Sequence, residues 1–205
     1  MKAKPQAHGR DPKSTRPVIK PATRHPGEVR LIGGHYRGRK LPVADRPGLR
    51  PTPDRVRETL FNWLGQDLDG WRVLDAFAGS GALGFEAASR GAAEVLLLET
   101  DPALVASLRA SRERLGATAV KVERSEALRW MAGGAPQRFE AVLLDPPFDA
   151  GLGAAAAAAA ARIVVPDGFV YLEGPEPLAE PPPGLTLHRS LRAGAVHAQL
   201  FVAAA

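Results

Sequence analysis

The chain has 205 residues, no cysteine and a formal net charge of +5 at pH 7, which excludes a disulfide framework and a thiolate metal site. Its length allows one large α/β domain with an appendage, and its five histidines show no metal-ligand spacing. No apolar stretch approaches membrane-spanning length, and the basic amino terminus lacks the apolar segment of a secretory signal. We therefore expect a cytoplasmic protein without membrane contact and without a metal.

The positive charge is concentrated near the amino terminus. Residues 1–60 hold 15 Lys and Arg against 5 Asp and Glu, whereas residues 61–205 hold 12 against 17. A basic arm on a mildly acidic body is typical of a protein that binds a polyanion. Residues 1–25 are rich in Pro, Lys and Arg and nearly free of apolar periodicity, so we predict a disordered basic tail. The same composition fits a tail that is only solvated.

A hairpin and a helix are predicted within residues 26–68. The hairpin occupies residues 29–43 and bends at Gly33-Gly34 or Gly38. Thr52 is expected to cap the helix, with Pro53 at its first position. The apolar positions of the two elements are Val29, Leu31, Leu41 and Val43, and then Val56, Leu60, Trp63 and Leu64.

Two arginines of this helix have two possible roles. Arg55 lies off its apolar stripe and Arg57 near the border of the stripe. Either side chain can bind phosphate, and either can simply solvate a helix face.

From residue 70 onward the pattern alternates between strand and helix. Short apolar runs predict buried parallel strands, and a final pair of alternating segments predicts an antiparallel hairpin. An alanine-rich segment from Gly153 to Arg162 predicts a helix. The predicted strands are residues 72–77, 94–99, 119–123, 140–145 and 168–173, followed by Leu185–Arg192 and His197–Ala203.

A glycine-rich loop follows the first of these strands. Gly79, Gly81 and Gly84 satisfy G-x-G-x-x-G, a spacing that allows a tight turn and a close approach of the backbone to a ligand. The next strand ends at Glu99, twenty residues after Gly79, where an acid can hold two ribose hydroxyls. These features predict an adenosine-bearing cofactor, and NAD fits them as well as any other. Asp75 adds an acid that disfavours a pyrophosphate and favours the cationic amino-acid end of S-adenosylmethionine.

The most informative motif is Asp145-Pro146-Pro147-Phe148. It closes an apolar run, so its acid is expected at the carboxyl end of a buried strand, where open α/β sheets place their ligands. Two prolines fix the backbone and remove two N–H donors, which leaves carbonyl and carboxylate oxygens next to an aromatic ring. Rigid acceptors beside a stacking surface suit a nucleobase with an exocyclic amine. By itself the motif also fits a proline-stiffened turn.

Together, the glycine loop and the Asp-Pro-Pro-Phe motif resemble those of class I S-adenosylmethionine-dependent methyltransferases that modify exocyclic amines. The segments Val29–Leu41 and Gly48–Leu64 are similar to the RsmD family of guanine-N2 methyltransferases of small-subunit (16S) ribosomal RNA. The second segment contains the motif Arg-Pro-Thr-Pro-Asp-Arg-Val-Arg-Glu. The resemblance runs from about Val29 to Leu152. Two positions depart from the family pattern: Ser111-Arg112 replaces an Asn-Leu pair, and Glu126 stands where an Asp is usual.

The resemblance implies a Rossmann-like class I methyltransferase fold, with a seven-stranded, mostly parallel sheet in residues 69–205. It implies that residues 26–68 bind RNA, that ribosomal RNA or the small ribosomal subunit is the partner, and that S-adenosylmethionine is the cofactor of a monomeric enzyme. The expected catalytic residues are Asp145, Pro146, Pro147 and Phe148. The expected cofactor-binding residues are Asp75, Phe77, Gly79, Ser80, Gly81, Gly84, Glu99 and Glu126. The expected RNA-binding residues are Arg37, Arg39, Arg50, Arg55 and Arg57.

Three other functions remain open at this point. An adenine-N6 DNA methyltransferase would use Asp-Pro-Pro-Phe equally well, and only the amino-terminal segments argue against it. A catalytically idle RNA-binding protein can retain the same fold, although the intact acids Asp75, Glu99 and Asp145 argue against this. A NAD-dependent dehydrogenase accounts for the glycine loop but not for Asp-Pro-Pro-Phe.

Overall fold

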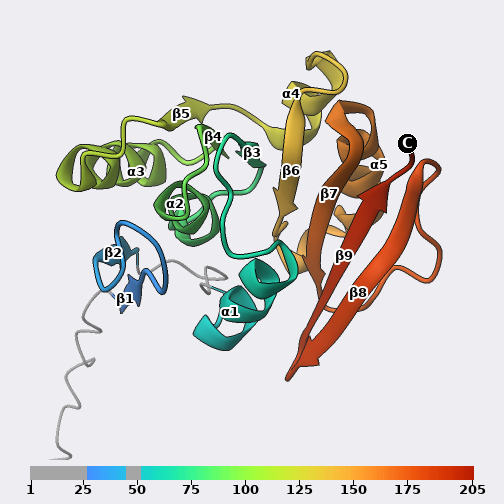
Figure 1. The fold of residues 1–205 in the computed structure, drawn as a ribbon, viewed down its shortest axis with the longest axis horizontal. Coiled ribbons are helices and arrows are strands. Elements are labelled where there is room, and N and C mark those ends of the chain that lie inside the picture. The colour runs from blue at the N-terminus through green and yellow to red at the C-terminus, as the bar shows by residue number, and fades with distance from the viewer. Residues whose placement is uncertain (1–26, 45–51) are drawn as a thin grey trace, which may run out of the picture.

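A seven-stranded sheet forms the centre of the computed structural model, which describes residues 27–44 and 52–205 (Figure 1). The strands lie in the order β5-β4-β3-β6-β7-β9-β8, and β9 alone runs antiparallel to its neighbours. The predicted α/β sheet with a carboxyl-terminal antiparallel hairpin is thus confirmed. Its strands are β3 (Arg72–Asp75), β4 (Glu94–Glu99), β5 (Val120–Arg124), β6 (Phe139–Leu144), β7 (Val164–Gly174), β8 (Leu185–Ala193) and β9 (Val196–Ala203).

Helices cover both faces of this sheet, which explains why its central strands are apolar throughout. Successive side chains of a strand point to opposite faces, so Val73 joins one hydrophobic cluster and Leu74 the other. The first cluster includes residues of α1 (Asp54–Trp63), α2 (Ala82–Ser89) and α3 (Pro102–Leu115), and the second includes residues of α4 (Ala127–Gly133) and α5 (Gly153–Ile163). A short 3-10 helix, η1 (Phe148–Ala150), precedes α5. In the described part of the chain, no helix combines the length and the apolar composition needed to span a membrane.

The predicted amino-terminal hairpin is confirmed and lies beside α2 and α3 (Figure 1). Its strands are β1 (Gly27–Arg30) and β2 (Lys40–Val43), and the four predicted apolar positions are all buried. On the α3 side, Arg114 Nη2 donates to the Lys40 carbonyl oxygen at 2.9 Å, and Arg39 Nη2 donates to the Arg114 carbonyl oxygen at 3.4 Å. The hairpin is therefore part of the folded body of the protein.

The predicted start of α1 is wrong by one residue, and Thr52 therefore has a different role from the predicted one. The helix begins at Asp54, and Pro53 occupies the N-cap without a side-chain capping bond. Thr52, which was expected to cap the helix, is buried, and its hydroxyl donates to Asp145 Oδ2 at 3.5 Å. The threonine is thus used in a contact with the end of β6, 93 residues away, rather than in local capping.

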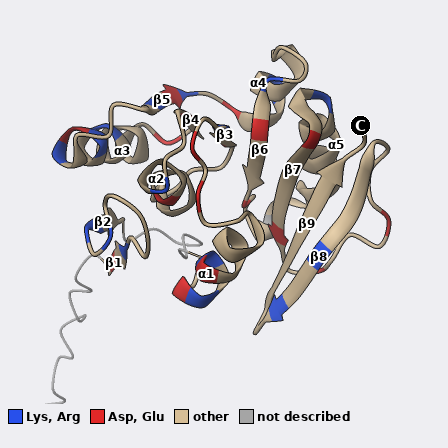
Figure 2. Ribbon diagram, in the orientation of Figure 1, with Lys and Arg blue, Asp and Glu red and all other residues tan. Residues whose placement is uncertain are grey.

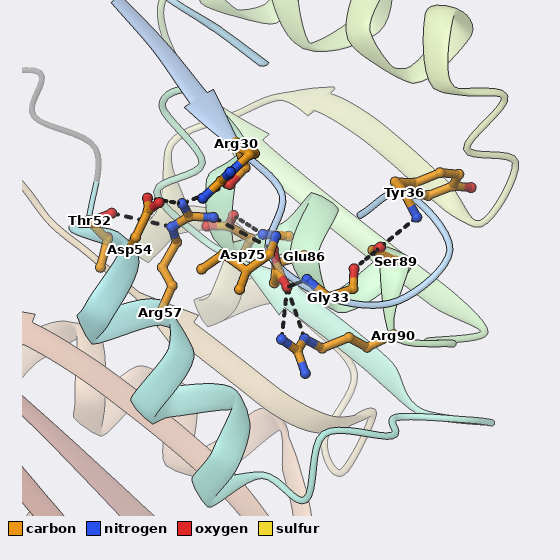
Figure 3. A network of polar contacts seen from close by, with 12 residues as sticks. Arg30, Gly33, Tyr36, Thr52, Asp54, Arg57, Asp75, Glu86, Ser89 and Arg90 are labelled. Atoms are coloured by element: carbon orange, nitrogen blue, oxygen red, sulfur yellow. Dashed lines mark hydrogen bonds and ion pairs between the residues drawn. The ribbon is translucent and has the colours of Figure 1, made fainter. Parts of the chain in front are cut away.

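A fully buried carboxylate in α2, Glu86, joins the amino-terminal elements to the sheet domain (Figure 3). Its oxygens accept hydrogen bonds from the backbone N–H groups of Ile32 and Gly33, each at 2.8 Å. They also form ion pairs with Arg90 at 3.0 Å and with Arg57 at 3.6 Å. Because a buried charge is costly unless it is paired and hydrogen-bonded, these four partners must be in place together.

Arg57 extends this network from α2 to α1 and β1. It is fully buried, and its Nη2 donates to the Arg30 carbonyl oxygen at 2.9 Å and to Asp54 Oδ1 at 2.6 Å. Its Nε donates to the Thr52 carbonyl oxygen at 3.3 Å. One guanidinium thus fixes the end of β1, the start of α1 and the position of Thr52.

The turn of the hairpin approaches the end of α2 so closely that only glycine fits. Gly34 has a φ of +69°, and a Cβ there would lie 1.7 Å from the Ser89 carbonyl oxygen. The Ser89 hydroxyl donates to the Gly33 carbonyl oxygen at 2.5 Å and accepts from the Tyr36 N–H at 2.8 Å. The consecutive glycines are therefore a requirement of packing as well as of the bend.

We expect Glu86→Ala to lower the free energy of unfolding by about 3–5 kcal/mol, because it removes the buried acceptor of two backbone N–H groups and the carboxylate partner of Arg90 and of Arg57 Nη1. Urea denaturation provides the measurement. Glu28→Ala is the matched control, since Glu28 forms an exposed pair with Lys40 in the same hairpin and should change stability by less than about 1 kcal/mol. Equal stability of the Glu86 variant and the parent would contradict this assignment.

Candidate active site

Four acids lie at the carboxyl ends of four neighbouring strands. Asp75 ends β3, Glu99 ends β4, Asp145 follows β6 and Glu173 is the penultimate residue of β7. β3 lies between β4 and β6, and β7 is next to β6, so the four acids share one edge of the sheet. This is the edge at which open α/β sheets bind ligands.

The glycine loop between β3 and α2 packs directly on this edge. A Cβ on Gly84 would lie 2.2 Å from Leu97 Cδ2, so α2 can approach β4 only with glycine at this position. The Gly84 N–H donates to Asp75 Oδ2 at 2.9 Å, and the Gly79 N–H donates to Glu99 Oε2 at 3.0 Å. Two acids of the row thus hold the loop through its backbone. Of the other predicted loop residues, Ser80 and Gly81 lie between the anchored Gly79 and Gly84, and Phe77 precedes them. Gly81 is buried and the other two are half-buried.

Asp75 is almost fully buried and incompletely satisfied. Its side-chain Oδ1 has no hydrogen-bond partner. Burial raises the pKa of Asp75 from 3.8 to about 7; the Gly84 N–H opposes this shift, and the charge of Glu99 adds to it. A buried anion with a free oxygen attracts a cationic group. This fits the ammonium end of S-adenosylmethionine, which is what the sequence predicted for Asp75.

Glu99 organises the backbone around it. Its Oε1 accepts from the N–H groups of Thr100 at 2.7 Å and Asp101 at 2.9 Å, in addition to the bond between Oε2 and Gly79. The side chain is half-buried. An ionised carboxylate has about four acceptor positions, so Oε2 can still accept from a ribose hydroxyl. The predicted ribose contact is geometrically possible and stays a prediction.

Glu126 is exposed and has a structural role that the sequence did not indicate. It is the N-cap of α4, and its oxygens accept from the N–H groups of Leu128 at 2.9 Å and Arg129 at 2.7 Å. An open hollow of about 780 Å³ adjoins it, lined in part by Thr100 and Trp130. The hollow contains neither Asp75 nor Asp145, so it lies at the periphery of the row of acids. The predicted adenine contact of Glu126 stays a prediction.

The four residues of the Asp-Pro-Pro-Phe motif leave the sheet in the predicted manner. Asp145 is half-buried, Pro146 is buried, Pro147 is exposed and the Phe148 ring is 38% exposed. Burial, followed by the charges of Glu173 and Asp75, raises the pKa of Asp145 well above its usual range. An exposed aromatic ring is thus presented next to an acid that has few solvent contacts.

Two residues of this site were missed by the sequence reasoning. Glu173 is 2% exposed, and its Oε1 accepts from the Tyr171 hydroxyl at 2.8 Å. Thr52 comes from the other end of the chain. A signal for Glu173 was available, because an acid that ends an apolar strand next to Asp145 is the same pattern that identified Asp145 itself. No local signal places Thr52 in the site.

The predicted RNA-binding arginines fall into three groups. Arg37, Arg39 and Arg55 are exposed, the first two in the amino-terminal hairpin and the third on α1. Figure 2 shows Lys and Arg on this hairpin, on α3 and on β8. Arg50 lies outside the described residues. The prediction for Arg57 is wrong, because a side chain with no exposed surface cannot reach a phosphate and is already paired with Glu86 and Asp54.

This architecture and site define a class I methyltransferase fold. A putative methyltransferase structure from Escherichia coli superimposes with a TM-score of 0.76 at 42% identity, covering 87% of this chain and 99% of that one. A putative methylase structure from Haemophilus influenzae gives a TM-score of 0.74 at 36% identity, covering 87% of this chain and all of the other.

The sequence comparisons identify the family. The family described as Conserved hypothetical protein 95 matches residues 29–202. Ribosomal RNA small subunit methyltransferase D of Escherichia coli is 52% identical over 127 residues, which cover 62% of this chain and 63% of that protein. The matched part is therefore just under two thirds of this curated relative's length. The chain belongs to this family, the RsmD family, as its motifs predicted.

We expect the stability of the cofactor-free protein to fall between about pH 4 and pH 7, because the folded protein there keeps a proton on Asp75 that the unfolded chain has lost. Asp75→Asn has no proton to lose at this position, so it avoids the cost of ionising a buried acid. The Tm of the variant relative to that of the parent should therefore rise from pH 5 to pH 8. Asp69→Asn, at an exposed position, serves as the control in the same thermal melts. A Tm difference that does not change with pH would show that Asp75 is not the titrating group.

Proposed function

We propose that this chain transfers a methyl group from S-adenosylmethionine to the exocyclic N2 amine of a guanine in small-subunit ribosomal RNA. One observation carries the proposal. The acid of Asp145-Pro146-Pro147-Phe148 follows β6, which is the direct neighbour of β3, and β3 leads into the glycine loop. A base-binding motif and a cofactor-binding loop are thus adjacent at one edge of the sheet, in a chain that belongs to the RsmD family.

The residues that would hold the cofactor are those around the glycine loop. The free Oδ1 of Asp75 attracts the ammonium group, and Glu99 accepts from ribose hydroxyls while it holds the Gly79 N–H. Gly84 allows α2 to lie close to the sheet, and Gly81, with a φ of +78°, has no room for a Cβ beside Leu108 and Phe85. When bound, S-adenosylmethionine supplies a methyl group that its sulfonium already activates, so no further electrophilic assistance is needed.

The residues that would hold the base are those of the Asp-Pro-Pro-Phe motif. The target guanine must leave its stack to present its amine, and the exposed ring of Phe148 provides a surface on which it can stack. Asp145 and the Pro146 carbonyl oxygen accept hydrogen bonds from the amine and direct its lone pair toward the methyl group. The rate gain comes mainly from proximity and orientation.

The amino-terminal elements would bring the RNA to this site. In this proposal residues 1–25 form a basic tail, residues 26–68 the RNA-binding extension and residues 69–205 the methyltransferase domain. The extension is fixed to α2 by Glu86, and α2 begins at the glycine loop, so RNA bound there is held in a defined position relative to the cofactor. A single chain provides every residue invoked, so the proposed enzyme acts as a monomer, in the cytoplasm where ribosomal subunits assemble.

We expect Asp145→Ala to reduce single-turnover methyl transfer to ribosomal RNA at least about a hundredfold, as expected when a positioning contact is lost. Cofactor affinity, measured by calorimetry, should change little, because Asp145 faces the base. Asp145→Asn is the matched variant, since it keeps one acceptor oxygen and should retain more transfer than alanine. Near-normal transfer by Asp145→Ala would reduce the motif to a structural turn.

We expect Arg37→Ala and Arg55→Ala to lower the slope of log affinity against log salt by up to about 1 each, because each phosphate contact releases counterions. RNA affinity across a salt series is the measurement. Arg189→Ala is the control, because Arg189 is exposed on β8, the strand at the opposite edge of the sheet from β5. Deletion of residues 1–25 tests the tail. If the deletion abolishes binding while both extension variants bind like the parent, the tail rather than the extension holds the RNA.

A further inference from the structure

The last two strands form a basic element in the otherwise acidic body of the protein. Residues 61–205 hold 12 Lys and Arg against 17 Asp and Glu, but β8 and β9 contain no acid at all. β8 carries Arg189 and Arg192, both exposed, and β9 carries His197, which is half-buried. Figure 2 shows basic residues and no acid along β8. The function proposed above gives this element no role.

The register of the sheet places one of these arginines at the edge where the active site lies. Asp145 and Glu173 directly follow the last paired residues of β6 and β7. Glu173 in turn pairs with Ala198 of β9, and Ala198 pairs with Leu191 of β8. Arg192 is the next residue, so it lies one position beyond the row of acids. Because three strand spacings separate β6 from β8, its backbone is roughly 15 Å from the Asp-Pro-Pro-Phe motif.

Arg192 lies on the face of the sheet that carries α5. It pairs with His197, and the side chains of a directly opposed pair share one face. Alternation along β9 puts His197 on the same face as Phe201, which belongs to the hydrophobic cluster of α5. Arg189, by contrast, pairs with Leu200 of the other cluster and lies on the opposite face. The Asp-Pro-Pro-Phe motif leads through η1 into α5, so Arg192 shares a face with the helix that the motif enters.

The guanidinium of Arg192 is oriented but not neutralised. Its Nε donates to the Gly194 carbonyl oxygen at 3.3 Å, within the exposed turn between β8 and β9. Among the residues that the structure describes, no acid forms an ion pair with it. Both of its Nη groups therefore remain available, and the planar fork of an arginine suits the bidentate binding of a phosphate.

We propose that the tip of the β8–β9 hairpin, residues 191–197, is a second RNA-binding surface, in which Arg192 binds a phosphate of the RNA that flanks the target guanine. This inference rests on the proposed function. The row of acids repels a polyanion, so RNA that places a base over Asp145 must be held by cations on either side of the row. The amino-terminal hairpin provides them on the side of α2 and α3, and the β8–β9 tip provides Arg192 on the opposite side (Figure 1).

Arg192→Ala tests this surface with a transcript of small-subunit ribosomal RNA as the probe. We expect its affinity for the transcript to fall roughly three- to tenfold at low salt, and the slope of log affinity against log salt to fall by up to about 1. Arg192→Lys keeps the charge and should retain most of both. Arg189→Ala is the matched control, because it removes the same side chain from the other face of the same strand. In methyl transfer, Arg192→Ala should raise the KM for RNA and leave kcat within about twofold, since it weakens binding without touching the target amine.

A second readout does not depend on activity or on the loss of a charge. A photo-crosslinking amino acid at Ala195, exposed in the β8–β9 turn, should form a crosslink to the transcript. The same group at Asp167, exposed near the start of β7 and thus toward the opposite edge of the sheet, should not. If the parent binds the transcript but Arg192→Ala binds like Arg189→Ala, or if Ala195 gives no crosslink, this surface is overturned and the proposed function stands. Arg192 then only protects an edge strand from pairing with other sheets. A parent that binds no ribosomal RNA overturns the proposed function itself.

Discussion

The buried carboxylate of Glu86 is the contact on which the arrangement of the whole site depends. It lies in α2, the helix that begins at the glycine loop, and it binds both the backbone after β1 and the guanidinium of Arg57. Arg57 in turn holds the Thr52 carbonyl oxygen, which places the Thr52 hydroxyl beside Asp145. The amino-terminal extension, the glycine loop and Asp145 are therefore linked through one network of buried polar contacts.

The electrostatic character of the site follows from the strand order. Four parallel neighbours, β4, β3, β6 and β7, each bring an acid to the same edge, and three of these acids are removed from water to an extent that raises their pKa values. Such a cluster costs stability in the free protein. A cationic cofactor bound beside these acids would offset this cost, because a positive charge stabilises their ionised forms.

Much of this could be predicted from the sequence, because the signals were local. Short apolar runs predicted the strands. Glu99 and Asp145 were found because each directly follows four apolar residues, and Asp75 because it follows the strand residues Val73-Leu74 and precedes the glycine loop. The errors concern residues whose environment is set by distant parts of the chain. Arg57 looks like a surface residue at the border of its helix's apolar stripe, and only the packing of α1 against α2 and β1 buries it. Thr52 has the sequence context of a helix cap, but its partner is 93 residues away.

The most direct test of the proposed reaction is to map modified guanines in the small-subunit ribosomal RNA by mass spectrometry. RNA from cells that lack this gene is compared with RNA from the same cells carrying the parent gene or the Asp145→Ala variant. We expect one N2-methylguanine to disappear with the gene, to return with the parent gene and not to return with the variant. A small-subunit RNA with the same modified guanines in all three cases would contradict it, as would a lost methyl group that maps to an adenine.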